Sequence, residues 1–333
     1  MPSSPVLIIA EVGSVHDGSL GNAKKLIDLA KECGADIVKF QTHIAEAETL
    51  RNAPQPPYFK GEPRYEYFER TGFSLEQWKE LKAHCDSIGI EFLSSPFSIE
   101  AVKLLEEVGV KRHKIPSGEV TNIPLLKEVA ATKKQVLLSS GMSSWEELNE
   151  AVATIREVHN DIVVMQCTSE YPCPPDHVGL NVLGDMRERY KLPVGFSDHT
   201  ITNYAAFAAV ALGMNVIEKH LTFSRKMYGS DAPHSLLPEE FTDLVNGIRS
   251  LEAVLAAPVD KTDPERYAGM KKIFEKSVVS VVAIPAGTKI TAEMLAVKKP
   301  GSGIPARRLG EVIGKTAKRD IPADSLLAEE DLG

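Results

Sequence analysis

Short apolar runs rich in β-branched residues recur along the first three quarters of the chain, and a stretch with apolar residues at helical spacing follows each one. Leu26, Ile27 and Ala30 show this spacing in one stretch, and Leu148 and Ala151 show it in another. We predict strands at residues 6–13, 37–43, 91–97, 112–119, 136–141, 162–169, 193–200 and 216–222. Eight such strand–helix units without a long interruption favour a closed, parallel (β/α)8 barrel over an open doubly wound sheet.

The pattern changes after Leu255. A polar stretch that contains Pro258 and Pro264 follows, and this composition is typical of a linker. Residues 277–284 then have the pattern of a strand, 285–288 that of a turn and 291–293 that of a helix start. We therefore predict a barrel domain at residues 1–257, a linker at 258–276 and a small second domain at 277–333.

The composition limits the class of protein and its partners. With 43% hydrophobic and 25% charged residues among 333, the chain is expected to be globular. A formal net charge of −8 argues against nucleic acid or an anionic membrane as a partner. Because the sequence shows neither a signal peptide nor a membrane-spanning apolar run, we expect a cytoplasmic protein. The four cysteines have no zinc-ligand spacing, so we expect free thiols, with Cys167 as a packing residue.

Polar residues gather where the predicted strands end. A barrel of this kind carries its chemistry at the C-terminal ends of its strands, and buried polar groups need partners there. We therefore expect a pocket formed by Glu11, Lys39, Gln41, Ser95, Lys114, Ser117, Glu119, Ser139, Ser169, Ser197, His199 and His220.

Two histidines of this set are candidate metal ligands. His199 and His220 end the seventh and eighth predicted strands, which are neighbours in a barrel, so both imidazoles could reach one ion. The alternative is two unrelated, hydrogen-bonded histidines. Imidazole ligands suit Mn²⁺, Fe²⁺ or Zn²⁺ better than Ca²⁺, but the residue types do not select one metal.

Lysines and hydroxyl groups form a candidate anion site. Lys39 and Lys114 supply point charges, the serines supply donors, and Gly118 and Gly141 let the backbone approach an anion closely. The alternative for each lysine is a solvated surface position. Glu11 and Glu119 could activate water or orient a sugar hydroxyl, or they could be ion-pair partners of the lysines.

Seven motifs along the barrel region resemble those of the sialic acid synthase family. They are IAEVG (9–13), VKFQT (38–42), KIPSGE (114–119), SSGM (139–142), CTSEYP (167–172), GFSDH (195–199) and EKH (218–220). The C-terminal region, with KPGSGI (299–304) and GK (314–315), is similar to the antifreeze-like (SAF) domain of that family. The resemblance implies a TIM barrel followed by a SAF domain, paired as a domain-swapped homodimer.

The resemblance also implies a reaction and a role for each site residue. Phosphoenolpyruvate condenses with an N-acylated aminosugar aldose, Mn²⁺ or Mg²⁺ activates the sugar aldehyde, and phosphate leaves by C–O cleavage. His199 and His220 would hold the metal. Phosphoenolpyruvate would contact Lys39, Ser95, Lys114, Ser117, Ser139, Ser169 and Ser197. Glu119 would handle the attacking water, with Glu11 near the metal. The sugar would contact Gln41, Tyr171, Asp231 and Lys299.

The chain departs from the family pattern mainly on the sugar side. VHDG (15–18) stands where members often have NHNG, Ser169 where they often have asparagine, and Lys299 where they have arginine. APHS (232–235) replaces the familiar HKAS. We therefore expect either N-acetylmannosamine or a 2,4-diacetamido-trideoxyhexose as acceptor, giving N-acetylneuraminate or a legionaminate- or pseudaminate-type acid.

Two rival functions remain. One is another phosphoenolpyruvate-condensing synthase of keto-deoxy sugar acids, but a phosphorylated sugar would need a second basic patch, and the second domain argues against it. The other is a sugar-binding homologue without catalysis, which is disfavoured because Glu11, Lys39, Lys114, Glu119 and both histidines occur together.

Overall fold

The computed structural model describes residues 5–55 and 61–333. The chain forms two compact units, Met1–Ala257 and Pro258–Gly333. Each unit has its own apolar core, and each is described by itself below.

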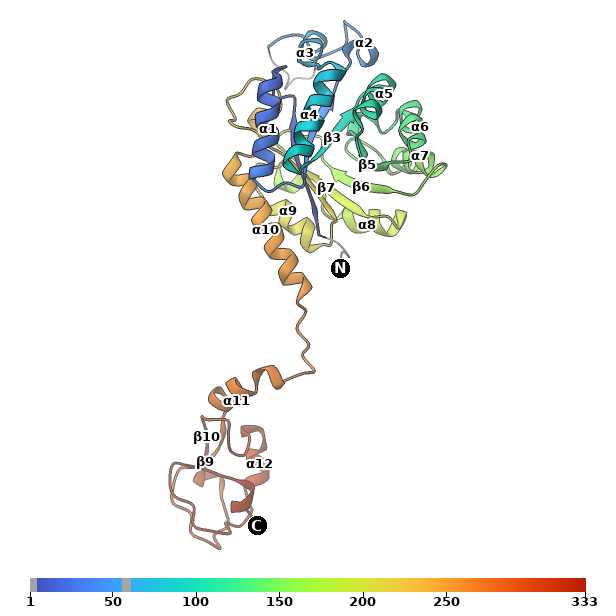
Figure 1. The fold of residues 1–333 in the computed structure, drawn as a ribbon. Coiled ribbons are helices and arrows are strands. Elements are labelled where there is room, and N and C mark those ends of the chain that lie inside the picture. Colours follow the sequence, from blue (N-terminus) through green and yellow to red (C-terminus); the bar gives the residue numbers. More distant parts are fainter. Residues whose placement is uncertain (1–4, 56–60) are drawn as a thin grey trace. The chain divides into compact units, whose positions relative to one another are not determined.

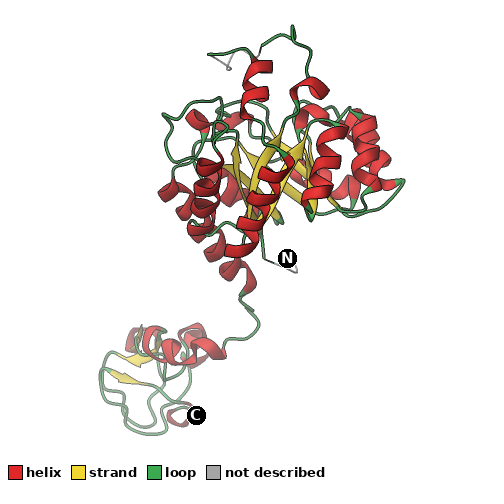
Figure 2. Cartoon of the chain, turned by 45° about the horizontal axis from the view of Figure 1, so that its top comes forward, coloured by secondary structure: helices red, strands yellow, loops and turns green. Residues whose placement is uncertain are grey.

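The first unit is a parallel barrel surrounded by helices (Figure 1; Figure 2). Its strands are β1 (Leu7–Gly13), β2 (Ile37–Thr42), β3 (Glu91–Pro96), β4 (Arg112–Ile115), β5 (Gln135–Ser139), β6 (Ile162–Cys167), β7 (Val194–Asp198) and β8 (Val216–His220). They are hydrogen-bonded in the order β3-β2-β1-β8-β7-β6-β5-β4, so the first strand pairs with the last. No ladder joins β3 to β4 within the described residues, and the barrel is therefore nearly closed. The predicted (β/α)8 architecture is confirmed.

Helices follow the strands and cover the outside of the barrel. They are α1 (Leu20–Glu32), α2 (Ala45–Glu48), α3 (Arg64–Thr71), α4 (Leu75–Ile88), α5 (Ile99–Val108), α6 (Ile123–Ala131), α7 (Trp145–Arg156), α8 (Val182–Tyr190), α9 (Tyr204–Ala211) and α10 (Pro238–Ala256). Local sequence fixes their ends. At α4, for example, Ser74 and Gln77 form a capping box, and Gly89 ends the helix in the left-handed conformation that glycine adopts without strain.

All the predicted strands except the first extend beyond the observed C-terminal ends, and the excess is largest at β4. The strand predicted at 112–119 ends at Ile115, because Pro116 cannot donate a backbone hydrogen bond and a 3-10 helix, Ser117–Glu119, follows. The strand predicted at 193–200 ends at Asp198. In both places the segment beyond the strand is a loop at the mouth of the barrel.

Alternation along the strands separates two apolar layers. Ile8, Ala10 and Phe40 face the surrounding helices and belong to the larger core. The intervening residues fill the barrel interior: Ile9, Ile37, Leu93, Leu137, Val163, Met165 and Val216. The interior below the site is therefore filled with apolar side chains.

The second unit is small and built around an antiparallel sheet. Strands β9 (Ser277–Ser280), β10 (Leu295–Lys298) and β11 (Ser325–Leu326) lie in the order β10-β9-β11. Helices α11 (Ala268–Phe274) and α12 (Leu309–Val312) belong to this unit. None of the helices in residues 5–55 and 61–333 is long and apolar enough to cross a membrane.

Candidate active site

Polar side chains replace apolar ones on the inner face of the strands toward their C-terminal ends. On β1, Ile9 is followed by Glu11, and on β8, Val216 is followed by Glu218 and His220. Because every second residue shares a face, these polar groups continue the inward-facing rows. The inner face thus ends in a polar layer at the mouth of the barrel, where such folds carry their chemistry.

Two lysines and two glutamates form a buried ionic cluster in this layer. Lys39 Nζ lies 2.7 Å from Glu11 Oε2 and 3.6 Å from Glu218 Oε1. Lys114 Nζ donates to Glu218 Oε1 at 3.0 Å, and Ser197 Oγ donates to the same oxygen at 3.0 Å. All five side chains are buried. Both lysine charges are therefore balanced within the protein.

The two carboxyl groups of the cluster differ in acidity. Burial raises the pKa of Glu11 to about 7, although Lys39 opposes this effect. Burial also acts on Glu218, but the ammonium groups of Lys114 and Lys39 outweigh it and hold the pKa of Glu218 at about 2. Glu218 thus stays ionised, whereas Glu11 can exchange a proton near neutral pH.

Glu218 is a site residue that the sequence prediction missed. Its signal was present, because it precedes His220 by two positions in EKH and shares its face of the strand. Its importance follows from the barrel, whose interior brings Lys39 of β2 and Lys114 of β4 to Glu218 of β8 although neither strand is its neighbour.

Serine hydroxyls converge on Gly141. An ideal Cβ on Gly141 would lie 2.5 Å from the Oγ atoms of both Ser117 and Ser169, so only glycine leaves this space open. Lys39 Nζ donates to Ser95 Oγ at 3.3 Å, and Ser139 is buried at the end of β5. The predicted anion-binding residues thus lie around the ionic cluster and beside this glycine.

The two histidine rings lie close together, in an edge-to-face arrangement. Their ring centroids are 5.5 Å apart, and Tyr171 stacks on His199 at 4.2 Å. His199 Nδ1 lies 2.7 Å from the carbonyl oxygen of Thr168, to which it donates, so Nε2 keeps a lone pair in the neutral ring. Burial favours that neutral ring, but the neighbouring Cys167 outweighs burial and raises the pKa of His199. His220 Nδ1 is buried and has no hydrogen-bond partner among the described residues. Burial lowers the pKa of His220 to about 4, which favours the neutral, ligating form.

The imidazole nitrogens of His199 and His220 fit a divalent cation that the protein ligates only in part. Within residues 5–55 and 61–333, no group of three or more His, Cys, Asp or Glu side chains is arranged to hold an ion. His199 and His220 would therefore be two ligands, and substrate or water would supply the others. Cys167 Sγ lies 3.9 Å from both nitrogens of His199, so this predicted packing residue also borders the site.

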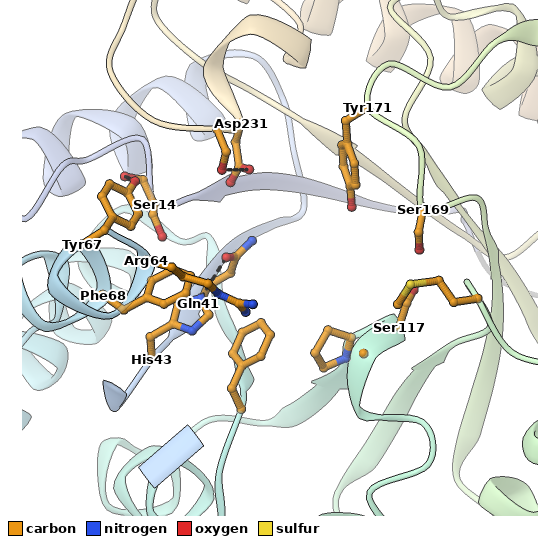
Figure 3. Close-up of a pocket in the computed structure, with 15 residues that line it drawn as sticks. Ser14, Gln41, His43, Arg64, Tyr67, Phe68, Ser117, Ser169, Tyr171 and Asp231 are labelled. Atoms are coloured by element: carbon orange, nitrogen blue, oxygen red, sulfur yellow. Dashed lines mark hydrogen bonds between the residues drawn. The ribbon is translucent and has the colours of Figure 1, made fainter. Parts of the chain in front are cut away.

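A cavity of about 400 Å³ opens next to Tyr171, which stacks on His199 (Figure 3). Predicted sugar contacts Gln41, Tyr171 and Asp231 line it. Gly13 is required here, since its φ is +49° and a Cβ would lie 2.2 Å from Asp231 Oδ2. The other lining residues are Ser14, His43, Arg64, Tyr67, Phe68, Phe97, Pro116, Ser117, Gly118, Met142, Ser169 and Ser230.

Glu119 is not part of this lining, and Lys299 belongs to the second unit. Glu119 ends the 3-10 helix after β4, accepts a hydrogen bond from Asn122 at 2.7 Å and lines a neighbouring cavity of about 230 Å³. Burial raises its pKa. Lys299 Nζ lies 4.9 Å from the centroid of the Phe274 ring. Their predicted roles stay predictions.

Comparison with known proteins identifies the family. The NeuB family model matches residues 26–260, and the SAF domain model matches residues 275–333. The chain belongs to the NeuB family. The resemblance seen in its motifs and the predicted combination of a barrel with a SAF domain are thereby confirmed.

NeuB relatives match along nearly the whole chain. The N,N'-diacetyllegionaminic acid synthase of Campylobacter jejuni is 38% identical over 97% of this chain and 99% of its own length. The human N-acetylneuraminate-9-phosphate synthase is 35% identical, covering 98% of this chain and 92% of that protein. The crystal structure of the N-acetylneuraminic acid synthetase of Leptospira borgpetersenii, in complex with citrate, has a TM-score of 0.71 at 29% identity over 79% of this chain and 90% of that one.

Proposed function

We propose that this NeuB protein condenses phosphoenolpyruvate with an N-acylated aminosugar aldose and releases phosphate, forming a nonulosonic acid. The observation that carries the proposal is the arrangement at one barrel mouth. Lys39 and Lys114, with converging serine hydroxyls, lie at the same mouth as the neighbouring rings of His199 and His220. Relatives named as synthases of legionaminic acid and of N-acetylneuraminate 9-phosphate support the same reaction class.

The ionic cluster would bind phosphoenolpyruvate. Its carboxylate and phosphate need point charges and hydroxyl donors, which Lys39, Lys114 and the serines near Gly141 provide. The lysine charges are balanced while Glu11 is ionised. Since the pKa of Glu11 is about 7, uptake of a proton there would leave a positive cluster for the anion.

His199 and His220 would hold the metal, for which we propose Mn²⁺ or Mg²⁺. When bound, the ion supplies Lewis-acid polarisation of the sugar aldehyde. The hydrogen bond from His199 to the Thr168 carbonyl orients that imidazole, and Tyr171 packs against its face. These contacts fix the direction of the donor lone pair.

We propose bond changes that balance as follows. C3 of phosphoenolpyruvate attacks the aldehyde carbon, the aldehyde oxygen takes up a proton from solvent and becomes a hydroxyl group, and positive charge develops at C2. Water adds to C2 and gives one proton to Glu119; the C2–O bond to phosphate then breaks, and the new C2 hydroxyl loses its remaining proton as it becomes the ketone carbonyl. A carboxyl group whose pKa is raised by burial is suited to this proton transfer near neutral pH.

Release of phosphate is the test of this function. Phosphoenolpyruvate and Mn²⁺ are incubated with N-acetylmannosamine or with 2,4-diacetamido-2,4,6-trideoxyhexoses, and the products are identified by mass spectrometry. The proposal expects sugar-dependent phosphate release with a matching nonulosonic acid. If the protein releases no phosphate with any of these sugars, the proposal is contradicted.

A His220 variant tests the metal assignment separately. His220→Ala is expected to abolish Mn²⁺ binding, measured by calorimetry or by electron paramagnetic resonance of free Mn²⁺, and metal-dependent turnover with it. An unchanged circular dichroism melt would show that the variant folds. Undiminished Mn²⁺ binding in a folded variant would contradict the ligand assignment.

A further inference from the structure

Arg64 is a cation of the cavity to which the proposed chemistry gives no role. It is the first residue of α3, is half-buried and lines the cavity, and Figure 3 shows its side chain directed into that space. Its Cζ lies 5.2 Å from the centroid of the Phe68 ring, which supports the guanidinium from one side. Among the described residues no carboxylate pairs with it. Its N–H donors are therefore available to a ligand.

An aromatic wall stands beside Arg64. The His43 ring is stacked between Phe68, at 3.6 Å, and Phe97, at 4.0 Å, and all three side chains line the same cavity. Both ring nitrogens of His43 are already engaged, with Glu48 Oε1 at 2.7 Å and Gln41 Oε1 at 3.1 Å. The wall thus offers a ligand a fixed, largely apolar surface, with the guanidinium as its polar neighbour.

The opposite side of the cavity differs in character. Tyr171 and Ser169 lie across from Arg64 in Figure 3, close to His199, on which Tyr171 stacks. That side is where the aldehyde end of the acceptor must lie if the histidines hold the metal. The aromatic wall and Arg64 therefore face a part of the sugar away from the reacting carbon.

We propose that Arg64 and the aromatic wall of Phe68, His43 and Phe97 form a subsite for a second N-acylamino group on the acceptor. The acyl oxygen accepts from the guanidinium, and the acyl methyl packs against the aromatic rings. The inference rests on the proposed function and deepens it. It names a diacetamido sugar, and not N-acetylmannosamine, as the preferred acceptor class.

The surrounding charges favour a neutral acyl group over an anion such as a sugar phosphate. Asp231 lines the same cavity, and Glu119 is close enough for Arg64 to oppose the rise of its pKa. A phosphate dianion needs several converging donors, whereas the wall next to Arg64 supplies apolar surface. An acyl group fits this subsite better, because its carbonyl oxygen can accept from the Arg64 guanidinium while its methyl group contacts the aromatic rings.

The test compares acceptors in the wild-type protein and in Arg64→Met, which keeps an unbranched apolar side chain over Phe68. We expect wild type to prefer 2,4-diacetamido-2,4,6-trideoxymannose over N-acetylmannosamine in kcat/KM. In Arg64→Met that preference should fall by about 10- to 100-fold, the value of one or two charge-assisted hydrogen bonds. Because Arg64 also opposes the rise of the Glu119 pKa, its loss should change kcat for both sugars alike, so the ratio of the two kcat/KM values is the readout. Arg64→Lys should give an intermediate ratio.

Arg51→Met is the matched control. Arg51 also lies over an aromatic ring, with Cζ 4.2 Å from the Tyr65 centroid, but it is exposed and not part of the cavity lining. The Arg51→Met substitution should leave the preference for the diacetamido sugar unchanged. Equal losses for both sugars in Arg64→Met, or no preference in wild type, would overturn the subsite. So would selective, Arg64-dependent use of N-acetylmannosamine 6-phosphate. Absence of phosphate release with every sugar would instead contradict the proposed function itself.

Discussion

At the scale of single residues, Gly141 marks the predicted phosphate pocket. Gly141→Ala would place a methyl group 2.5 Å from the hydroxyls of Ser117 and Ser169, which would have to move. We expect the KM for phosphoenolpyruvate to rise roughly tenfold or more, with little change in the KM for the sugar. Steady-state kinetics with each substrate varied in turn measures this.

A second glycine provides the control for that change. Gly184 lies within α8, and a Cβ there would meet nothing within 4 Å. Gly184→Ala should leave both KM values unchanged. Equal KM values for phosphoenolpyruvate in wild type and Gly141→Ala would place the phosphate elsewhere.

His16 is expected to make the stability of the barrel depend on pH. Burial lowers its pKa from the usual 6.5 to about 4, and its Nδ1 accepts a hydrogen bond from the Gly18 N–H. Between these pH values the unfolded chain binds a proton that the folded chain does not. The free energy of unfolding should therefore fall as the pH is lowered from 6.5 to 4, by roughly 3 kcal/mol from this group.

Urea unfolding followed by tryptophan fluorescence measures that loss, because Trp78 and Trp145 both lie in the barrel unit. His16→Asn, which keeps an acceptor but cannot gain the charge, should flatten the decline between pH 6.5 and 4. His177→Gln, at an exposed position, should not. The same decline in His16→Asn and wild type would show that another group is responsible.

The sequence could supply the residue types of the site but not all of their partners. The lysines, serines and histidines were predictable because each lies in a strand, mostly in its C-terminal part, or just after one. Glu218 was missed as the hub of the cluster, since its partners come from β2, β4 and β7. Arg64 was missed because it begins a helix in the segment between β2 and β3, outside the strand ends that the prediction followed.

At the scale of elements, a buried ion pair joins the ends of β7 and β8. Lys219 Nζ donates to Asp198 Oδ2 at 2.6 Å and to the carbonyl oxygen of Thr200 at 2.7 Å. Asp198 and Thr200 flank His199 in the sequence, and Lys219 directly precedes His220. Lys219→Met should lower the free energy of unfolding by about 3–5 kcal/mol, because it leaves the Asp198 charge buried without its cation.

An exposed pair on α1 is the comparison. Lys25 and Asp28 are 2.9 Å apart, with the lysine side chain 73% exposed. Lys25→Met should cost less than about 1 kcal/mol in the same urea experiment. If the two substitutions had equal small effects, the buried pair would not hold the strand ends together.

The elements themselves were largely predictable, and their ends were not. Periodicity found all eight barrel strands, because parallel strands covered on both faces form short apolar runs. The prediction ran past the C-terminal end of every strand but β1, most of all at β4, because polar residues at the barrel mouth continue the pattern beyond the last ladder hydrogen bond. Pro116 was the available signal for the end of β4.

At the scale of the whole molecule, the homodimer stays a prediction, supported by exposed apolar side chains on α11. Met270, Ile273 and Phe274 are 56%, 58% and 55% exposed. Light scattering after size-exclusion chromatography should give twice the chain mass for wild type. Met270→Glu with Ile273→Glu should shift it toward the chain mass, and a monomeric wild type would contradict the dimer.

The central claim is that phosphoenolpyruvate loses phosphate by C–O cleavage while its C3 joins an aminosugar. Phosphoenolpyruvate carrying ¹⁸O in the bridging position tests this most directly, with the phosphate and the sugar acid analysed by mass spectrometry. The account predicts that the label leaves with phosphate and that the oxygen at C2 of the product comes from water. Label retained in the product would mean P–O cleavage and would contradict the mechanism built on these residues.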